Sequence, residues 1–392
     1  MKAKFDTIVV GLGAMGSASI YHLAKRRNKV LGIDQYQVPH NYGSTHGESR
    51  IIRQAIGEGQ QYMPLVLRSY ELWREIEKVT GKTLLTITGG LILEPAEGDT
   101  VTHGRHRFLA QTISCANQYN IRHEILEKRD IEKRFPQFAV TNELGYFEYE
   151  TGYLRPEFCI AAQLGLAKEH GATIQTNEKV ISINHGGNAG VTLKTDRSTY
   201  EADKLVLSVG PWVAQFLPPE YVDVFRIYRQ VLYWFKIKSG AELTYLPGKF
   251  PIFIWIFERG GDFGLYGFPS LDGKTVKVAT EQYSVCTSPE KVDRIVNKKE
   301  IQAMYLTYIR DQFPGLTDVC ENAVSCLYTT TPDSHFIIDF YPGNDQIIIA
   351  SPCSGHGFKH SAAIGEIISE MVLHGTTKTD ISGYRLNRFA GY

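Results

Sequence analysis

The stretch FDTIVVGLGAMGSASIYHLAKRR, residues 5–27, decides the fold of this chain. Residues 5–10 form a short apolar run that ends at a glycine, which is typical of a buried parallel strand. The glycine fingerprint GLGAMG follows at 11–16, and residues 17–27 carry apolar side chains at helical spacing. A second apolar segment, 29–33, ends on Asp34. This order of strand, helix and strand predicts a βαβ unit.

The fingerprint and the acid behind the second strand together predict a dinucleotide site. Gly11 would permit the tight turn, Gly13 would let the backbone approach a pyrophosphate, and Gly16 would let the helix pack on its strand. Asp34 follows Gly16 by 18 positions, close to the distance expected of a carboxylate that accepts hydrogen bonds from ribose hydroxyls. The alternative is a glycine-rich turn without a ligand. It does not account for the coincidence of four features: the fingerprint, the strand before it, the helix after it and the acid at the end of the second strand. The motif alone does not distinguish NAD from FAD.

Two interleaved domains are predicted from the rest of the pattern. Segments resembling the first strand lie at 172–176, 204–209, 336–339 and 346–350, and a last helix is expected at about 357–373, before His374 and Gly375. Aromatic and β-branched runs at 226–238, 253–257, 264–268 and 275–280 predict an antiparallel sheet in between. The fold class is therefore α/β with an α+β second domain. The dinucleotide-binding domain is assigned 1–80, 146–215 and 325–392, and the substrate domain 81–145 and 216–324.

Composition narrows the class of protein. A length of 392 residues indicates two domains, and 43% hydrophobic with 21% charged residues is ordinary for a globular chain. Basic and acidic residues both number 42, so the balance argues against a nucleic-acid binder. No apolar run reaches membrane-spanning length, and the start does not resemble a signal peptide, so we expect a cytoplasmic location. The six cysteines show neither metal-ligand spacing nor disulfide density.

Four further segments carry a family resemblance. They are GSTHGESRIIR at 43–53, YGFP at 266–269, CLYTTTPD at 326–333 and SGHGFK at 354–359. In this order, behind the βαβ unit, they resemble the monomeric sarcosine oxidase and N-methyl-tryptophan oxidase family, flavoproteins of the D-amino-acid oxidase-like superfamily. The resemblance covers essentially the whole chain. It implies a Rossmann-like FAD domain, covalent FAD, a monomer, and oxidation of secondary amines of amino acids with O₂ as acceptor.

The resemblance assigns several residues to the cofactor. Cys326 would hold the flavin as a thioether to its 8-methyl group, which requires a thiolate in an electropositive neighbourhood. We expect the other five cysteines to be small buried hydrophobes. Gly355 and Gly357 would allow close approach of a flat ligand, and Gly357 would open the last helix, with its N-terminus directed at the flavin. The further cofactor residues implied are Ser44, His46, Arg50, Val180 and Lys359.

A second group of residues is implied for the substrate and for oxygen. Arg53 and Lys359 match the cations that bind the substrate carboxylate in the family. For Arg50 and Arg53 the alternative is a pair of surface arginines that form salt bridges. We expect Arg50 and Arg53 on a helical or turn segment that lets both face the same way. Lys277 lies in an alternating strand pattern that alone favours an outward side chain. The resemblance instead places Lys277 over the flavin ring, as the cation that stabilises the charge formed on oxygen.

Tyrosines and one departure complete the expected pocket. Tyr266 matches a pocket-lining tyrosine, while Tyr62 and Tyr328 are weaker candidates because the chain holds 22 tyrosines. Counted without gaps from Tyr266, Glu281 stands where the family usually has a histidine near the substrate amine. Glu281 is either a solvated residue at a strand end or an extra negative charge in the pocket. In the second case, sarcosine becomes less certain as the substrate.

Together these features predict an FAD-dependent oxidase of N-methyl or cyclic secondary α-amino acids. Its small-molecule substrate would form an imine that hydrolyses, and O₂ would be reduced to H₂O₂. No metal, nucleic-acid or membrane partner is expected. Two other classes stay open: a flavin dehydrogenase that passes electrons to a carrier, and a non-catalytic dinucleotide-binding subunit. Oxygen consumption during turnover would distinguish an oxidase from the dehydrogenase. Bleaching of the flavin by an amine would distinguish an enzyme from the non-catalytic subunit.

Overall fold

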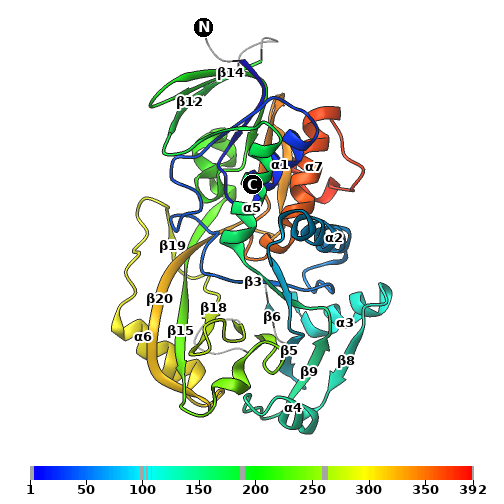
Figure 1. The fold of residues 1–392 in the computed structure, drawn as a ribbon, viewed down its shortest axis with the longest axis vertical. Helices are drawn as coiled ribbons and strands as arrows, with labels where there is room; N and C mark the ends of the chain where they lie inside the picture. The colour runs from blue at the N-terminus through cyan, green and yellow to red at the C-terminus, as the bar shows by residue number, and fades with distance from the viewer. Residues whose placement is uncertain are drawn as a thin grey trace.

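Two sheets lie one above the other along the long axis of the molecule, as Figure 1 shows, with the N-terminus at the upper end. The computed structural model describes residues 4–390 except 98–100, 103–104, 107, 186–189 and 258–263. In this part of the chain, no helix combines the length and the apolar character needed to cross a membrane.

The upper sheet grows from the βαβ unit. Its strands are β1 (Lys4–Val10), β2 (Val30–Ile33), β11 (Thr173–Gln175), β12 (Val180–Asn184), β13 (Val191–Thr195), β14 (Thr199–Leu207), β21 (Ile337–Tyr341) and β22 (Asn344–Ser351). β1 lies between β2 and β14 and is parallel to both, while β11 continues beyond β2 and β22 pairs with β14, also in parallel. The neighbours of the βαβ unit thus come from distant parts of the chain, as the sequence predicted. β21 is antiparallel to β22, because a connection of only two residues permits only a hairpin.

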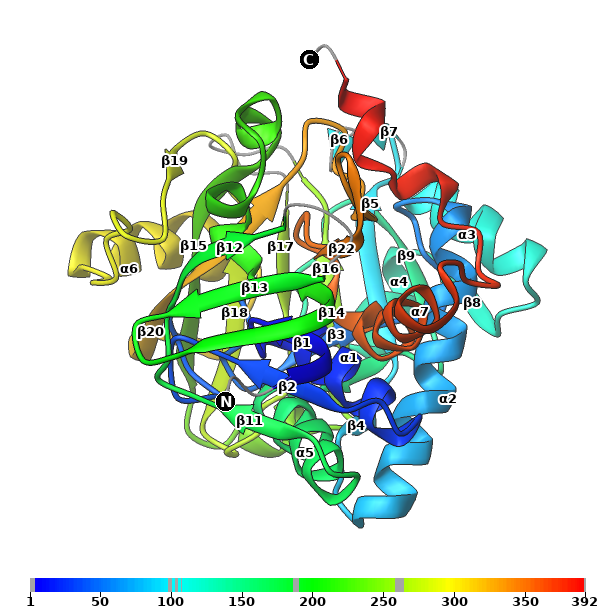
Figure 2. The same ribbon diagram turned by 90° about the horizontal axis from the view of Figure 1, so that it is seen from above.

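Four helices pack beside this sheet: α1 (Ala14–Lys25), α2 (Met63–Thr80), α5 (Pro156–Glu169) and α7 (Ser361–His374). Figure 2 shows α1, α2 and α7 gathered on one side of the strands. α1 and α7 approach closely, since a Cβ on Gly365 would lie 2.4 Å from the Cβ of Ala18. The last helix ends as expected, with Gly375 at φ +72°. Its start was predicted wrongly: residues Phe358–His360 form a 3₁₀ turn, so Gly357 does not open an α-helix.

The lower sheet is largely antiparallel, as the aromatic and β-branched segments predicted. Its strands are β5 (Gly90–Pro95), β8 (His123–Leu126), β9 (Glu143–Glu148), β15 (Arg226–Ile237), β16 (Ile252–Trp255), β17 (Leu265–Gly267), β18 (Thr275–Thr280), β19 (Cys286–Thr287) and β20 (Leu316–Thr330). Only β5 and β16 pair in parallel. The long strands β15 and β20 lie side by side along the molecule in Figure 1, from Arg226 opposite Thr330 to Ile237 opposite Leu316.

Aromatic side chains fill the core behind the lower sheet. Phe138 stacks on Phe250 with ring centroids 4.9 Å apart, and Phe253 and Phe313 close the cluster. Shorter elements surround it: α3 (Phe108–Gln118), α4 (Lys128–Arg134), α6 (Lys298–Met304) with a π-helical turn (Tyr305–Ile309), and the hairpin β6 (Val101–Thr102) and β7 (Arg105–His106). The 3₁₀ segments are Gln60–Tyr62, Gly210–Phe216, Pro219–Val224, Glu242–Tyr245, Phe358–His360, Ser382–Tyr384 and Leu386–Phe389.

A small three-stranded sheet joins the two halves and carries Arg50. It consists of β3 (Arg50–Ile52), β10 (Gly152–Leu154) and β4 (Leu85–Ile87), with both outer strands antiparallel to β10. The expectation of a helical or turn segment was therefore wrong for Arg50, while Arg53 directly follows the end of the strand. The β-branched pair Ile51 and Ile52 favours a strand, and pairing with β10 fixes it.

The two sheets interleave along the chain. Strands of the upper sheet come from the first 33 residues, from 173–207 and from 337–351, and those of the lower sheet from the intervening segments. We propose the same two-domain division as before. Two of the proposed domain boundaries, at 145/146 and 324/325, fall within strands of the lower sheet, β9 and β20.

Candidate active site

A long cavity lies at the carboxyl ends of β1 and β2. About 1340 Å³ of free space, including the part open to solvent, is enclosed there. Eight of the residues predicted to bind the cofactor line it: Gly11, Gly13, Asp34, Ser44, Arg50, Val180, Gly355 and Gly357. The other four, Gly16, His46, Cys326 and Lys359, do not line this cavity. Their positions are described below.

The three glycines of the fingerprint occupy distinct environments. Gly11 has φ +84°, and a Cβ there would lie 2.5 Å from the carbonyl oxygen of Ser208. A Cβ on Gly16 would lie 1.8 Å from the carbonyl oxygen of Gly11, so only glycine lets α1 pack so closely on the turn. A Cβ on Gly13 would meet only Thr45 Oγ1, at 3.7 Å. Asp34 closes this end of the cavity and accepts hydrogen bonds from the backbone N–H of Leu12 at 2.8 Å and of Tyr36 at 2.9 Å.

Unpaired polar atoms near the other end of the cavity suit a flavin. Ser44 Oγ and His46 Nε2 are buried and have no hydrogen-bond partner among the described residues. Burial, with Arg50 and Lys277 nearby, lowers the pKa of His46 to about 3, so the imidazole is neutral. Buried polar groups need partners, and an isoalloxazine ring presents hydrogen-bonding atoms along its edge. With the glycine turn and Asp34, these residues fit FAD.

The environment of Cys326 is electropositive, but burial dominates it. The side chain is on β20 and is 1% exposed, and Sγ lies 3.7 Å from Arg50 Nη2 and 3.5 Å from the carbonyl oxygen of Ser44, both of which line the cavity. Burial raises the pKa of the thiol, although Arg50 and Lys277 act to lower it. Among the other cysteines, Cys286 is exposed, contrary to prediction, and Cys353 lines the cavity.

The glycines before the last helix differ in what they accommodate. Gly355 has φ +80°, and a Cβ there would lie 3.0 Å from the Tyr328 ring and 3.2 Å from the Tyr283 hydroxyl. A Cβ on Gly357 would lie 1.7 Å from the carbonyl oxygen of Pro352. Gly357 is therefore needed for packing of its own loop, whereas the sequence interpretation attributed it to ligand approach.

A second cavity adjoins the first and collects the residues predicted for the substrate. It has about 790 Å³ of free space, counting the open part, and shares Arg50, Tyr328, Gly355 and Phe358 with the cofactor cavity. Its walls include Arg53, Lys359, Tyr266 and Glu281. Tyr62, a weaker candidate, does not line it; its hydroxyl lies 2.7 Å from His335 Nδ1.

Arg53 and Lys359 are joined by a residue that the sequence analysis missed, Glu58. Its Oε2 accepts a hydrogen bond from Arg53 Nη2, and its Oε1 accepts one from Lys359 Nζ at 3.3 Å. All three residues are at most 6% exposed. Burial lowers the pKa of Lys359 to about 8, although Glu58 acts to raise it. Nothing in the local sequence distinguishes this glutamate, because its partner Lys359 is 301 positions away.

Glu281 lies at the pocket wall, just beyond the end of β18, as the second interpretation of this residue required. Tyr283 donates a hydrogen bond from its hydroxyl to Glu281 Oε2 at 3.0 Å, and the hydroxyls of Tyr266 and Tyr328 lie 3.2 Å apart beside it. Burial raises the pKa of Tyr283 well above 10, and Glu281 adds to this. These tyrosines therefore stay neutral and can act as hydrogen-bond donors.

Lys277 points inward, against the outward orientation that the strand pattern alone favoured. It is 3% exposed, its Nζ donates hydrogen bonds to the carbonyl oxygens of Gly47 and Ser49, both at 2.7 Å, and it lies 4.0 Å from the centre of the Phe268 ring. Burial and Arg50 lower its pKa well below 10.5. Lys277 lines neither cavity directly.

The site thus joins a dinucleotide cavity to a small pocket lined by three cations, two carboxylates and two tyrosines. Such a pocket is suited to hold a zwitterion against the flavin end of a bound dinucleotide. Among the described residues, no group of three or more His, Cys, Asp or Glu side chains is arranged to hold a metal.

Comparisons with known proteins agree with this geometry. A protein family described as "FAD dependent oxidoreductase" matches residues 6–371. Monomeric sarcosine oxidase of Streptomyces avermitilis is 38% identical over 100% of this chain and 99% of its own length, and N-methyl-L-tryptophan oxidase of Salmonella dublin is 33% identical over 99% and 100%. Among solved structures, the open form of NikD, titled an unusual amino acid oxidase, has a TM-score of 0.85 at 23% identity over 97% of both chains, which shows a common fold.

Proposed function

The chain belongs to the FAD-dependent oxidoreductase family and to its sarcosine oxidase-like amine oxidases, and within this group we propose that it oxidises an N-methyl or cyclic secondary α-amino acid, with O₂ as acceptor. The observation that carries the proposal is the pair Arg53 and Lys359, which meet across one carboxylate beside the cofactor cavity. Full-length similarity to oxidases of N-methyl amino acids supports the substrate class.

Arg53 and Lys359 would bind the substrate carboxylate. In the structure, the two oxygens of Glu58 already join these cations, which supports their proposed use as a carboxylate-binding pair. A substrate carboxylate would take over these contacts from Glu58. Arginine suits this role because its planar guanidinium can donate two parallel hydrogen bonds.

Glu281 and the tyrosines would act on the amine end of the substrate. The carboxylate of Glu281 attracts a cationic amine and can accept its N–H, while Tyr283 holds Glu281 in place. Tyr328 lines both the pocket and the cofactor cavity, and with Tyr266, which lines the pocket, it would limit the size of the N-substituent. The amine must lose its proton before it is oxidised, and Glu281 opposes that loss.

Bound FAD would supply the redox chemistry, as acceptor of a hydride from the α-carbon or the N-methyl carbon of the substrate and as the source of the electrons that reduce O₂ to H₂O₂. The residues that would hold it are Gly11, Gly13, Asp34, Ser44 and His46, with Cys326 as the site of a thioether. Arg50 lines the cavity, and Lys277 lies buried behind the lining residues; both would act as cations near the flavin. There they would stabilise negative charge that forms on oxygen.

The proposal is tested in an oxygen electrode with a panel of N-methyl and cyclic amino acids. Oxygen uptake with equal formation of H₂O₂ is the expected result, and the best substrate identifies the amino-acid side chain. Anaerobic bleaching of the yellow protein by an amine, without oxygen uptake in air, would indicate a dehydrogenase instead. Absence of bleaching with every member of the panel would contradict the proposal.

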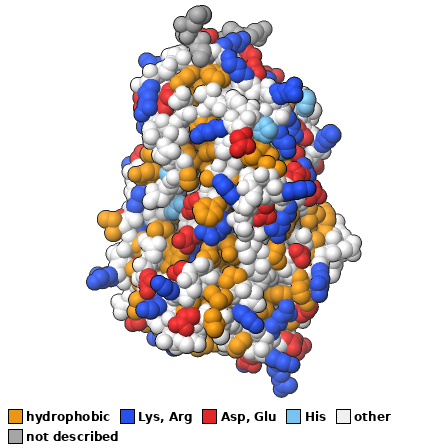
Figure 3. Space-filling model, in the orientation of Figure 1, with side chains coloured by type: hydrophobic (Ala, Val, Ile, Leu, Met, Phe, Trp, Pro, Cys, Tyr) orange, Lys and Arg blue, Asp and Glu red, His pale blue; other side chains and the backbone are white. Residues whose placement is uncertain are grey.

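We also propose that the protein works as a monomer on small molecules, as the name of its Streptomyces relative suggests. Figure 3 shows basic and acidic side chains interspersed on the face it displays, which agrees with the balanced charge and gives no reason to expect a nucleic-acid partner. Gel filtration with light scattering tests the monomer.

A further inference from the structure

We propose that Glu157 is a positioning residue for Lys277: it fixes the turn whose carbonyl groups bind the lysine and supplies part of the counter-charge of the ammonium. This inference rests on the proposed function in one respect, namely that Lys277 acts when oxygen is reduced. Neither the glycine fingerprint nor the segments that carry the family resemblance include Glu157.

The turn in question is Gly47–Ser49, directly before strand β3. Gly47 has φ +92° and Glu48 has φ +69°, so two consecutive residues adopt the left-handed conformation, which is unfavourable for glutamate. This conformation directs the carbonyl oxygens of Gly47 and Ser49 inward, and Lys277 Nζ donates to both at 2.7 Å. Lys277 therefore stays in place only while the turn keeps its shape.

Glu157 binds the opposite side of the same turn. Its Oε1 accepts hydrogen bonds from the backbone N–H of Gly47 at 2.7 Å and of Glu48 at 3.1 Å. A single oxygen atom thus satisfies both amides of the left-handed pair. Trp234 adds a third contact from β15, donating its Nε1–H to Glu48 Oε2 at 3.1 Å. The turn is held between Glu157 on its outer side and Lys277 on its inner side.

The fold explains why Glu157 meets Gly47. β10 and β3 are antiparallel, with Leu154 opposite Arg50. α5 begins two residues after Leu154 and the turn ends directly before Arg50, so both lie at the same end of this strand pair. Glu157 also lies in the first turn of α5, where the helix N-terminus favours a negative charge.

Charge gives Glu157 a second role. The groups that act electrostatically on Lys277 come from every element around it: Arg50 on β3 opposes the ammonium, while Glu157 on α5, Glu48 in the turn and the Cys326 thiol on β20 favour it. His46, also nearby, is neutral, and Phe268 and Trp234 present ring faces. A buried ammonium next to Arg50 needs compensation, and Glu157 is the carboxylate that both compensates it and orders its ligands.

Two substitutions separate the two roles. Glu157→Gln keeps an oxygen that can accept from both amides but removes the charge, and Glu157→Leu removes both. Stopped-flow measurement of the holoenzyme follows reduction by substrate and reaction of the reduced enzyme with O₂ separately across pH. We expect Glu157→Leu to slow the oxygen reaction on the order of 10-fold and to affect reduction less, since an ordered charge is lost. Lys277→Met gives the largest decrease in the rate of the oxygen reaction that loss of the lysine can cause. Glu169→Gln, which changes an exposed glutamate at the far end of α5, is the matched control and should react as the wild type does.

The pH dependence of the oxygen reaction distinguishes the proposed electrostatic role of Glu157 from a merely structural one. With one counter-charge removed, the ammonium of Lys277 loses its proton more easily, so the oxygen reaction of Glu157→Gln should decline at a lower pH than in the wild type, by about half to one unit. Wild-type profiles in both Glu157 variants would overturn the inference. A wild-type protein whose reduced flavin does not react with O₂ would instead contradict the proposed function.

A second readout does not depend on activity. Hydrogen–deuterium exchange of the peptide that contains residues 44–52 should become faster in Glu157→Leu and in Lys277→Met, and the effects should be non-additive in the double variant, because both side chains hold one turn. Glu157→Gln should retain most of the protection. Strictly additive effects, or unchanged exchange in Glu157→Leu, would show that Glu157 and Lys277 are not linked through the turn.

Discussion

At the scale of single residues, Glu281 gives the pocket its distinctive charge. Its carboxylate lines the proposed substrate pocket, where it would stabilise the protonated form of a bound amine. The reactive amine is the neutral form, so the rate of reduction should rise with pH toward an alkaline optimum. Glu281→Gln removes the charge at constant size, and we expect this profile to move to lower pH by about one unit. Stopped-flow reduction under anaerobic conditions measures it, with Glu132→Gln on exposed α4 as the control.

The same position should affect substrate choice. Glu281→His restores the residue type that the family resemblance led us to expect, and we expect it to improve turnover of sarcosine relative to the preferred substrate. The comparison is a ratio of kcat/KM values for the two substrates. An unchanged ratio together with an unchanged pH profile would place the function of Glu281 outside substrate recognition.

Lys359 should limit binding on the alkaline side. Burial lowers its pKa to about 8, so the free pocket loses one of its two carboxylate-binding cations as the pH rises through that value. A simple carboxylate without an amine, such as acetate, isolates this effect from titration of the substrate. Its Kd, followed by perturbation of the flavin spectrum, should increase above about pH 8, up to tenfold per unit. Lys359→Arg stays charged and should abolish the increase; a similar increase in that variant would exclude Lys359 as its cause.

The sequence predicted some of the residues of the pocket and its surroundings but not others, and the difference depends on how far apart the contacting residues are in the chain. Arg53, Lys359 and Tyr266 were implied by segments that carry the family resemblance, and Glu281 by an ungapped count from Tyr266; all four line one cavity. Glu58 and Glu157 were missed. Each acts through a contact more than a hundred positions away in the chain, with Lys359 and with Gly47 respectively, and no local periodicity or spacing records such a contact.

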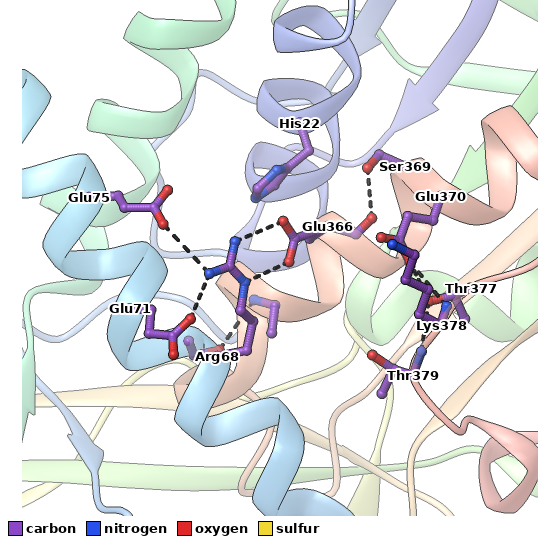
Figure 4. Close-up of polar contacts among 12 residues, drawn as sticks. His22, Arg68, Glu71, Glu75, Glu366, Ser369, Glu370, Thr377, Lys378 and Thr379 are labelled. Carbon is purple, nitrogen blue, oxygen red and sulfur yellow. Dashed lines mark hydrogen bonds and ion pairs between the residues drawn. The ribbon is translucent and has the colours of Figure 1, made fainter.

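At the scale of elements, the helices beside the upper sheet are tied together by one carboxylate. Glu366 on α7 accepts two hydrogen bonds from Arg68 on α2, at 2.8 and 3.0 Å, and lies 3.7 Å from Arg26 at the end of α1. Figure 4 shows Arg68 between Glu366 and the two glutamates of its own helix, Glu71 and Glu75. The hydrogen bonds from Arg68 lower the pKa of Glu366.

We expect Glu366→Gln to lower the free energy of unfolding by about 1 kcal/mol at neutral pH. The estimate is modest because Arg68 is 37% exposed and solvent screens the pair. Because the folded pKa of Glu366 is depressed, its contribution is present above the unfolded value near 4.5 and is lost as the pH falls through the folded value. Urea unfolding at pH 7 and at pH 3 should therefore show a smaller difference between variant and wild type at pH 3 than at pH 7. Glu75→Gln, which changes an exposed partner of the same arginine, should have little effect; an equal loss there would contradict the role of Glu366.

Element types were predictable where the pattern is periodic and long, as in the βαβ unit and strand β15. Strand β3 and the start of α7 were not. Three residues are too few for a period, and β3 is a strand because β10 and β4 complete its sheet. Before α7 lies a 3₁₀ turn, preceded by Gly357, which packs against Pro352; the order of residues reveals neither the turn nor this contact.

At the scale of the whole molecule, a covalent cofactor would join the two sheets. Gly11 and Asp34 follow β1 and β2 of the upper sheet, whereas Cys326 is on β20 of the lower sheet.

With the thioether in place, acid-precipitated wild-type protein should keep its yellow colour, and added FAD should not change its melting temperature. Cys326→Ala should release FAD on precipitation, and its melting temperature should rise with added FAD. The gain follows RT ln(1 + [FAD]/Kd), about 2.7 kcal/mol at a hundredfold excess over Kd. Cys353→Ala, which changes a cysteine that lines the same cavity, should behave as the wild type. Colour that passes wholly into the supernatant from wild-type protein would show that the cofactor is held by contacts alone, and the two sheets would then be joined only by the polypeptide.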